Sequence, residues 1–202
     1  MKKNKTILVL IGHPSKKSFS HKLAEKYAAG ASGAGHSVEM LDIYSMNPQL
    51  PLLNYEEYSE WDKDREVREL YQAKITKADK IVMFHPLWWG TPPPLLKNFI
   101  DQTLTPGFAY KFLPRKFIPE ALNILPRGYL KGKATHIFIT FDGYKLVYIC
   151  IGLPFITIWA LFTLFFCGIT NQRYSLHQRM RWSSETARNK WLSRAEKYGK
   201  KA

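Results

Sequence analysis

The first candidate for chemistry is a polar segment, His13-Pro-Ser-Lys-Lys-Ser-Phe-Ser20, which follows an apolar run at residues 6–11. A helical apolar pattern begins directly after it. Hydroxyls, unpaired amides and the positive end of a helix dipole would converge at this point, and such a convergence binds anions. A serine that only caps the helix explains the serines alone, but the histidine and the lysines favour a phosphate site.

The second candidate is an aromatic loop between a predicted strand and a predicted helix. Residues 81–84 form a short apolar run typical of a buried strand, and prolines at 92–94 precede apolar residues at helical spacing. The loop between them contains Trp88 and Trp89. Core packing is the alternative explanation of this pair, but adjacent side chains of an extended chain point in opposite directions. We therefore expect exposed indoles that can pack on a flat ring, and amides of residues 87–90 directed at the same ligand.

Short apolar runs that alternate with helical patterns predict the elements that position both loops. This alternation is typical of an α/β domain with a buried parallel sheet. The predicted strands are residues 6–11, 37–41, 81–84, 134–141 and 172–178, and the later helices are residues 65–77 and 183–199. Ligands of such sheets bind beyond the carboxyl ends of the strands, so the loops after the first, third and fourth strands should meet at one edge.

The glycines of the first half do not form a nucleotide-binding motif. Gly30, Gly33 and Gly35 follow the first predicted helix instead of the first strand, so we expect them to end that helix. A dinucleotide fingerprint would need its glycines directly after the first strand, and the segment there does not match a Walker loop either.

Composition bounds the class of protein. At 202 residues with 46% hydrophobic content, the chain suits one α/β domain over residues 1–202. Cys150 and Cys167 lie in an apolar stretch without metal-ligand spacing, so we expect buried, reduced thiols, no metal site and a cytoplasmic protein. The apolar run at residues 6–11 is too short for a signal peptide, which argues against secretion.

The formal net charge of +14 is concentrated in the second half of the chain. Such an excess suits nucleic acid, an anionic membrane surface or phosphorylated small molecules. Nucleic acid ranks last and is not expected as a partner, because no zinc-finger spacing, RNP-type strand or recognition helix accompanies the basic residues.

Residues 146–170 contain no charged side chain, and this length of 25 residues would suffice to span a membrane. Pro154, Thr157, Thr163 and Gly168 interrupt the segment, and a strand and helix of the same domain follow it. We expect a helix buried in the core or in a subunit interface. A transmembrane helix is the alternative, and peripheral membrane contact lies between the two.

Several segments together resemble the flavodoxin-like NAD(P)H quinone oxidoreductases, the family that includes DT-diaphorase and small bacterial relatives. They span most of the chain: His13-Pro-Ser-Lys-Lys-Ser-Phe-Ser20, Asp42-Ile-Tyr44, Phe84-His-Pro-Leu-Trp-Trp-Gly-Thr-Pro92, Leu96-Lys-Asn-Phe-Ile-Asp101, Pro106-Gly-Phe-Ala-Tyr110 and Leu130-Lys-Gly-Lys-Ala134. The resemblance implies a flavodoxin-like three-layer α/β sandwich, with a five-stranded parallel sheet in the order 2-1-3-4-5 and flavin between strands one and three.

The resemblance also implies roles for particular residues. The flavin phosphate and ribityl chain would be held by His13, Ser18, Phe19 and Ser20, the isoalloxazine would be lined by Pro86, Leu87, Trp88 and Trp89, and its other edge would be closed by Thr140 and Gly143. Tyr148 matches a tyrosine that assists hydride transfer in better-known members and is the catalytic candidate. The histidine that follows it by six residues in those members is replaced by Pro154.

The implied activity is a two-electron reduction of quinones by ping-pong hydride transfer from NADH or NADPH through the flavin. FMN is expected, with FAD as the alternative, because the short chain shows no adenosine pocket. The resemblance further suggests a homodimer whose interface completes each pocket. Two other functions stay open: a flavin-binding regulatory subunit of a membrane transporter, such as a potassium efflux system, and a nitro- or azo-reductase.

Overall fold

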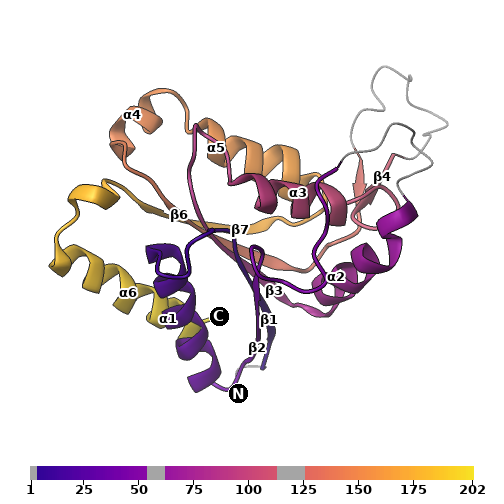
Figure 1. Cartoon of the computed structure of the whole chain (residues 1–202), viewed down its shortest axis with the longest axis horizontal. Coiled ribbons are helices and arrows are strands. Elements are labelled where there is room, and N and C mark those ends of the chain that lie inside the picture. Colours follow the sequence, from indigo (N-terminus) through magenta and orange to yellow (C-terminus); the bar gives the residue numbers. More distant parts are fainter. Residues whose placement is uncertain (1–3, 54–61, 113–125) are drawn as a thin grey trace.

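A parallel five-stranded sheet forms the centre of the protein (Figure 1). The structure is a computed structural model that describes residues 4–53, 62–112 and 126–202. Its strands are β1 Thr6–Ile11, β2 Ser37–Asp42, β3 Lys80–Pro86, β6 Ala134–Thr140 and β7 Asn171–His177. They lie in the order β2-β1-β3-β6-β7 with every pair parallel, so the predicted order of the five strands is confirmed. The direction of winding reverses between β1 and β3, where ligands of such sheets bind.

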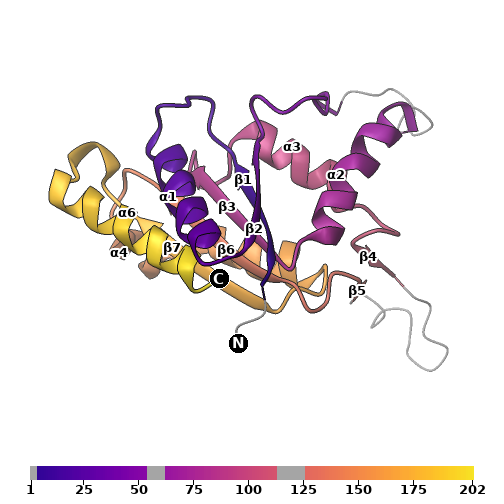
Figure 2. The same cartoon turned by 90° about the horizontal axis from the view of Figure 1, so that it is seen from below.

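Helices cover both faces of the sheet (Figures 1 and 2). One face carries α1 Phe19–Gly33 and α6 Glu185–Lys200, which lie side by side. The other face carries α2 Arg65–Lys77, α3 Pro94–Thr103, α4 Lys145–Cys150, α5 Pro154–Thr157 and the π-helix η3 Ile158–Phe165. A short antiparallel pair, β4 Tyr110–Lys111 and β5 Arg127–Gly128, and the 3₁₀ turn η4 Met180–Trp182 lie outside these layers.

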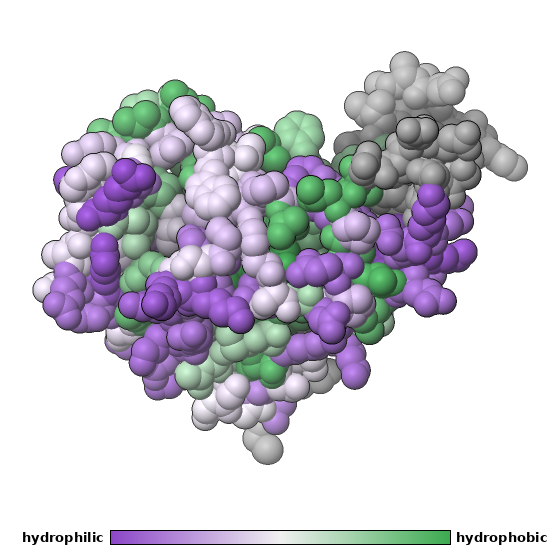
Figure 3. Space-filling view, viewed as in Figure 1, coloured by the Kyte–Doolittle hydropathy of each residue, from purple (hydrophilic) through white to green (hydrophobic). Residues whose placement is uncertain are grey.

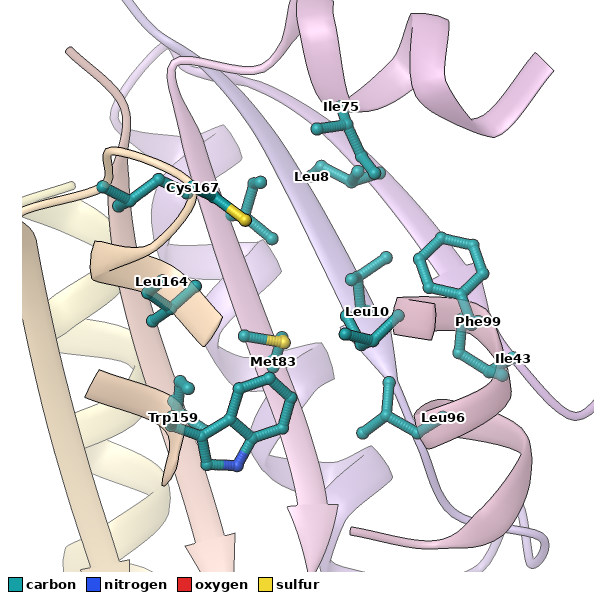
Figure 4. Close-up of a cluster of buried hydrophobic side chains, with 14 of the residues drawn as sticks. Leu8, Leu10, Ile43, Ile75, Met83, Leu96, Phe99, Trp159, Leu164 and Cys167 are labelled. Carbon is teal, nitrogen blue, oxygen red and sulfur yellow. The ribbon is translucent and has the colours of Figure 1, made fainter. Parts of the chain in front are cut away.

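Alternate residues of β1 face opposite sides of the sheet and divide the core into two clusters. Leu8 and Leu10 pack on the side of α2 and α3, whereas Ile7 and Val9 pack on the side of α1 and α6. Figure 4 shows the larger cluster, in which side chains of α3 and of the η3 segment meet over the sheet around Met83. Because the middle strands are buried on both faces, they are continuous apolar runs, which is why their sequences predicted them.

Two glycines allow α1 and α6 to approach closely. A Cβ atom on Gly30 would lie 2.1 Å from the backbone oxygen of Glu196, and a Cβ atom on Gly199 would lie 2.1 Å from the backbone oxygen of Tyr27. A larger residue at either place would push the helices apart. The prediction that Gly30 ends the first helix is therefore wrong, since α1 continues to Gly33 and uses Gly30 at the crossing.

The uncharged segment 146–170 does not form one buried helix. Gly152 and Leu153 have positive φ angles of 79° and 50°, and this turn separates α4 from α5. The residues of the segment that are buried in the core are Phe155, Trp159, Leu164, Cys167 and Ile169, and Tyr148, Leu153 and Ile156 pack against them while partly exposed. Others are exposed, as in Leu146 (69%) and Phe162 (71%), so the expectation of core burial fails for them. None of the helices in the described ranges has the length and hydropathy that crossing a bilayer requires.

The two cysteines differ in exposure. Cys167 is buried as predicted, but Cys150 is exposed because α4 buries none of its side chains, so the expectation of two buried thiols is wrong for Cys150. The connections after β2 and after α3 both include stretches outside the described residues, at 54–61 and 113–125.

Three histidines inside the fold predict a loss of stability in acid. Burial lowers the pKa of His85 to about 4, of His136 to about 3 and of His177 to about 4, and nearby cations contribute for the last two. The unfolded chain binds protons on these side chains below about pH 6.5, while the folded chain does not until about pH 4. Stability should therefore fall as the pH falls through this window.

Between pH 7 and pH 5 we expect each of these histidines to lower the free energy of unfolding by roughly 2 kcal/mol. Denaturant unfolding at several pH values measures this slope. His177 stacks on Phe138 at an interplanar angle of 8°, so His177→Phe keeps an aromatic ring while it removes one titrating group. The free energy of unfolding of this variant should depend less steeply on pH. An unchanged slope would show that His177 does not contribute to the pH dependence.

Candidate functional site

A cavity of about 420 Å³ lies at the carboxyl edge of the sheet, beyond the ends of β1, β3 and β6. We call it the sheet-edge cavity. Most of the binding residues predicted from the sequence line it, namely His13, Ser18, Phe19, Ser20, Pro86, Leu87, Trp88 and Thr140. These residues lie at or just beyond the ends of three strands and at the start of α1, so the structure brings them together as the topology predicts.

His13 presents a hydrogen-bond donor to the sheet-edge cavity. The backbone N–H of Ser15 donates to its Nδ1 atom at 3.0 Å, so the proton of the neutral ring is on Nε2. Burial lowers the pKa of His13, and the nearby His21 lowers it further. The ring is therefore neutral near pH 7 and can donate one hydrogen bond from Nε2. Its edge also contacts the indole of Trp88, with ring centroids 6.3 Å apart.

Ser18 is the N-cap of α1 and is tied to a histidine and an aspartate. Its Oγ accepts from the backbone N–H of His21 at 3.3 Å and lies 2.9 Å from Nδ1 of the same residue. On the other side of the ring, Nε2 lies 3.4 Å from Oδ2 of Asp42. Asp42 is held in turn by the N–H of Tyr44 and the hydroxyl of Ser45. Ser18 therefore has a structural role beside any role in binding.

Ser20 and the first turn of α1 supply further donors. Ser20 is buried, and its Oγ lies 3.5 Å from Oγ1 of Thr140 at the end of β6. This contact joins the start of α1 to the fourth strand of the sheet. The N–H groups of Phe19 and Ser20 belong to the first turn, where no carbonyl of the helix can accept them. Together with the helix dipole they make this corner of the cavity suitable for an anion.

The loop after β3 forms the apolar wall, but not in the way predicted. His85 and Pro86 still belong to the strand, so the loop begins at Leu87, whose N–H donates to the oxygen of Thr140 at 2.8 Å. Trp88 lines the cavity, and its N–H donates to the oxygen of Thr91 at 2.9 Å. The expectation that these two amides face a ligand is wrong because backbone carbonyls already accept from them.

Two of the predicted binding residues do not line the sheet-edge cavity. Trp89 has a φ angle of 49° and a fully exposed side chain, so it points away from the side taken by Trp88. Gly143 lies beneath the ring of Tyr148, where a Cβ atom would be 3.0 Å from Cε2 of that ring.

Tyr148, the predicted catalytic residue, lies between the sheet-edge cavity and α5, on the face of the sheet that carries α3 and η3. Its ring packs edge-on against Phe141, which lines the cavity, and against Phe155 of α5, with ring centroids 5.2 Å apart in both pairs. Tyr148 itself is not among the lining residues.

One side of the cavity is formed by residues that the sequence did not predict. The missed residues are Phe141, Asp142, Met180, Arg181 and Arg188. Most of them follow β7, whose carboxyl end lies at the same edge of the sheet as the other site loops. The signal was present in the sequence, since Arg179 and Arg181 come directly after the predicted fifth strand.

Arg188 carries positive charge to the cavity. Its Nε donates to Oγ of Ser183 at 2.8 Å and its Nη2 donates to the oxygen of Met180 at 2.7 Å. Both acceptors are uncharged, so these contacts fix the guanidinium without neutralising it. Arg181 differs, because its Nε lies 2.9 Å from Oδ2 of Asp142 and its charge is paired.

The cavity therefore has two chemical ends. One end offers N–H groups, hydroxyls and the Arg188 guanidinium, which suit a phosphate. The other end is formed by Pro86, Leu87 and Trp88, which suit a flat apolar ring. These two ends fit a flavin nucleotide, which has a flat, largely apolar ring system at one end and a charged phosphate at the other.

Comparison with known proteins agrees with this geometry. Residues 5–202 match the family described as having a flavodoxin-like fold. The chain belongs to this family. An uncharacterized NAD(P)H oxidoreductase of Haemophilus influenzae is 30% identical, covering 93% of this chain and 91% of its own. The mouse ribosyldihydronicotinamide dehydrogenase (quinone) is 27% identical, covering 81% of this chain and 77% of its own.

A solved structure extends the comparison. The NAD(P)H:quinone oxidoreductase of Methanothermobacter marburgensis is 25% identical and superposes with a TM-score of 0.78, covering 98% of this chain and 96% of that one. The resemblance that the sequence indicated, to flavodoxin-like NAD(P)H quinone oxidoreductases, is confirmed by these relatives.

Proposed function

We propose that the protein is a flavin-dependent NAD(P)H oxidoreductase that reduces quinones by two electrons in a ping-pong cycle. The overall reaction converts NAD(P)H, a proton and a quinone into NAD(P)⁺ and a hydroquinone. The single observation that carries this proposal is the sheet-edge cavity, with an anion-binding end at α1 and Arg188 and an aromatic end at Trp88. The NAD(P)H oxidoreductases among the relatives support it.

Different residues of the cavity would bind different parts of the flavin. The phosphate of the flavin would be held by the His13 Nε2–H, the hydroxyls of Ser18 and Ser20, the first amides of α1 and the Arg188 guanidinium. Pro86, Leu87 and Trp88 would orient its ring and exclude water from one side. We propose FMN, because the cavity offers one anion-binding end. When bound, the flavin supplies the hydride chemistry that no side chain of this site can supply.

Two serines give the first test of the phosphate end. We expect the double variant Ser18→Ala, Ser20→Ala to bind FMN roughly 10- to 100-fold more weakly, because hydrogen bonds to a charged group contribute about 1.5–3 kcal/mol each. The Ser18 hydroxyl contributes less than Ser20 to this loss, because its Oγ also contacts Nδ1 of His21. Titration of the apoprotein measures this. Ser18→Ala alone should also lower stability by about 0.5–2 kcal/mol, because it removes a helix cap.

Ser184 provides a matched control, since it caps α6 by accepting from the N–H of Ala187 at 3.2 Å and does not line the cavity. Ser184→Ala should lower stability to a similar extent and leave FMN affinity unchanged. If it weakened FMN binding as much as the double variant does, the serines of α1 would act only through stability.

Tyr148 gives a test of the reaction itself. We propose that its hydroxyl donates a hydrogen bond to the substrate, since its ring lies between Phe141 of the cavity and Phe155 of α5. Tyr148→Phe should lower the rate of flavin reduction about tenfold while the flavin stays bound, because one donor is lost and the ring packing is kept. Stopped-flow reduction by NADH and by NADPH measures the rate.

The matched control is Tyr144→Phe. The Tyr144 ring is exposed, and Cζ of Arg179 lies 4.8 Å from its centroid. This variant should react at the wild-type rate with both nucleotides. Equal rates for Tyr148→Phe and the wild type would mean that Tyr148 is only a packing residue.

Steady-state kinetics test the proposed reaction as a whole. NAD(P)H and quinone concentrations are varied together, and a ping-pong cycle gives parallel lines in a double-reciprocal plot. Intersecting lines would contradict the ping-pong order. No turnover by the flavin-loaded protein with any simple quinone would contradict quinone reduction.

A second function is favoured by one observation. Apolar side chains of α4 are exposed, and hydrophobic residues gather over that helix in the surface view (Figure 3). Such a surface suits a partner and is consistent with a regulatory subunit of a membrane transporter. Cell fractionation separates the two functions, because a regulatory subunit should sediment with membranes and a free-standing enzyme should not.

A further inference from the structure

A serine, a histidine and an aspartate lie in a row beside the sheet-edge cavity. Nδ1 of His21 lies 2.9 Å from Oγ of Ser18, and Nε2 of the same ring lies 3.4 Å from Oδ2 of Asp42. We call these residues the Ser18–His21–Asp42 triad. Ser18 lines the cavity, whereas the histidine and aspartate side chains do not and are only 7% and 19% exposed. A ligand of the cavity therefore meets the triad at its serine.

The neutral form of the His21 ring leaves Ser18 no hydrogen to offer to the cavity. A carboxylate only accepts hydrogen bonds, so the proton of a neutral ring lies on Nε2, on the side of Asp42. Nδ1 then accepts, and the Ser18 hydroxyl donates to it. Oγ of Ser18 also accepts from the backbone N–H of His21 at 3.3 Å. In this state the hydroxyl presents only a lone pair to the cavity, which repels an anion.

A protonated His21 ring reverses the role of the Ser18 hydroxyl. Nδ1–H then donates to Oγ, whose two lone pairs are both engaged, by this donor and by the backbone N–H. The hydrogen of the hydroxyl is thereby released to point at an anion. Asp42 favours this form too. Nε2 is buried without a well-directed hydrogen bond to any described residue, and its 3.4 Å separation from Oδ2 suits an ion pair better than a neutral hydrogen bond.

The neighbouring His13 does not compete for this proton. Its ring faces that of His21 with centroids 6.4 Å apart, but its Nδ1 already accepts from the N–H of Ser15, so a second proton would break that hydrogen bond. Burial and the nearby His21 both lower the pKa of His13. The other charged groups around the triad are the exposed Lys16, Lys17 and Lys22 of the same segment and Asp142, Arg181 and Arg188 of the cavity lining.

We infer that His21 is a positioning residue, which takes up a proton when the flavin phosphate binds and so directs the Ser18 hydroxyl to that phosphate. This inference rests on the proposed function, because the phosphate must lie at the α1 end of the cavity. A phosphate monoester carries about 1.5 to 2 negative charges at pH 7, and this charge stabilises an imidazolium behind the serine. The proton comes from solvent and stays on the ring. Flavin affinity should therefore fall as the pH rises.

Calorimetric titration of the apoprotein with FMN near pH 7.5, in two buffers with different enthalpies of ionisation, counts the protons exchanged. The second pKa of a phosphate monoester is about 6, so the free phosphate has already lost that proton at this pH. We expect a net uptake that approaches one proton per FMN. Riboflavin, which lacks the phosphate, should bind without uptake. Between about pH 7 and pH 8.5 the FMN affinity of the wild type should fall by up to about tenfold per pH unit.

Two variants remove different parts of the triad. His21→Gln removes the titrating ring, so it should bind FMN more weakly, without proton uptake and with an affinity that does not change over this pH range. Asp42→Asn keeps an acceptor for Nε2–H but removes the carboxylate charge, so it should take up less proton than the wild type near pH 7.5.

His36→Gln is the matched control. His36 is also a buried histidine whose Nδ1 accepts from a backbone N–H, that of Lys5 at 3.1 Å, and it does not line the cavity. This variant should keep the proton uptake and the FMN affinity of the wild type.

Three results would overturn the inference. The wild type could bind FMN without proton uptake. It could take up the same number of protons with riboflavin, which would separate the proton from the phosphate. His21→Gln could keep the uptake of the wild type, which would assign the proton to another group. Absence of binding by both flavins would instead contradict the proposed function, and the inference with it. The comparison of FMN with riboflavin needs only the wild type and holds if a variant does not fold.

Discussion

Replacing Arg188 with alanine is expected to weaken FMN binding by roughly 10- to 100-fold, because a charge-assisted hydrogen bond to a phosphate contributes about 1.5–3 kcal/mol. Arg188 is suited to this role by its position. Hydrogen bonds to Ser183 and Met180 hold its guanidinium at the cavity, and neither acceptor carries a charge that would compete with an anion. Titration of apoprotein with FMN, followed by flavin fluorescence, measures the change.

Arg194 is the matched control for this prediction. It lies on the same helix, carries the same charge, is exposed and does not line the cavity. Arg194→Ala should therefore bind FMN like the wild type, at the same ionic strength. Equal weakening in both variants would show that the overall positive charge, and not the contact made by Arg188, retains the flavin.

The second large effect is expected at the crossing of α1 and α6. Gly30→Ala should lower the free energy of unfolding by about 1–3 kcal/mol or more, because its methyl group would lie 2.1 Å from a backbone oxygen and the helices must separate. Flavin affinity should fall as well. The start of α1 and the Arg188 side chain of α6 form two parts of the same cavity, and their spacing depends on this crossing.

Gly33→Ala is the control, since Gly33 is also in α1 but a Cβ atom there would meet nothing within 4 Å. Alanine favours helix by up to about 1 kcal/mol over glycine, so this variant should be as stable as the wild type or more so. Denaturant unfolding compares the two. If Gly30→Ala were also neutral, the helices would have adjusted without loss and the crossing would not set the cavity.

Much of the fold could be predicted because its middle strands are buried on both faces. Residues 6–11 and 81–84 are apolar without interruption, and this pattern leaves few alternatives to a central parallel strand. The order of the strands came from the resemblance, since pairing between distant segments leaves no local trace. The prediction of one buried helix at residues 146–170 was wrong because composition does not show where a helix breaks. Here the helix is broken at Gly152 and Leu153, which have positive φ angles.

The site was predictable to the extent that strand ends share an edge. His13, Pro86 and Thr140 each follow or end a predicted strand, and the sheet brings them to one cavity. Arg188 could not be placed in this way, because it lies on a helix and reaches the cavity only through the packing of α6. The direction of Trp89 was equally hidden, since a tight turn with a positive φ angle reverses which side an indole faces.

The most direct test of the central claim is the visible absorption spectrum of the purified protein, together with dialysis of the apoprotein against FMN and FAD. We expect the spectrum of oxidised flavin, bleached by NADH or NADPH without oxygen and restored by a quinone. We also expect Arg188→Ala to lose flavin more readily than Arg194→Ala. A colourless protein whose apo form binds neither FMN nor FAD would contradict the assignment of the sheet-edge cavity as a flavin site.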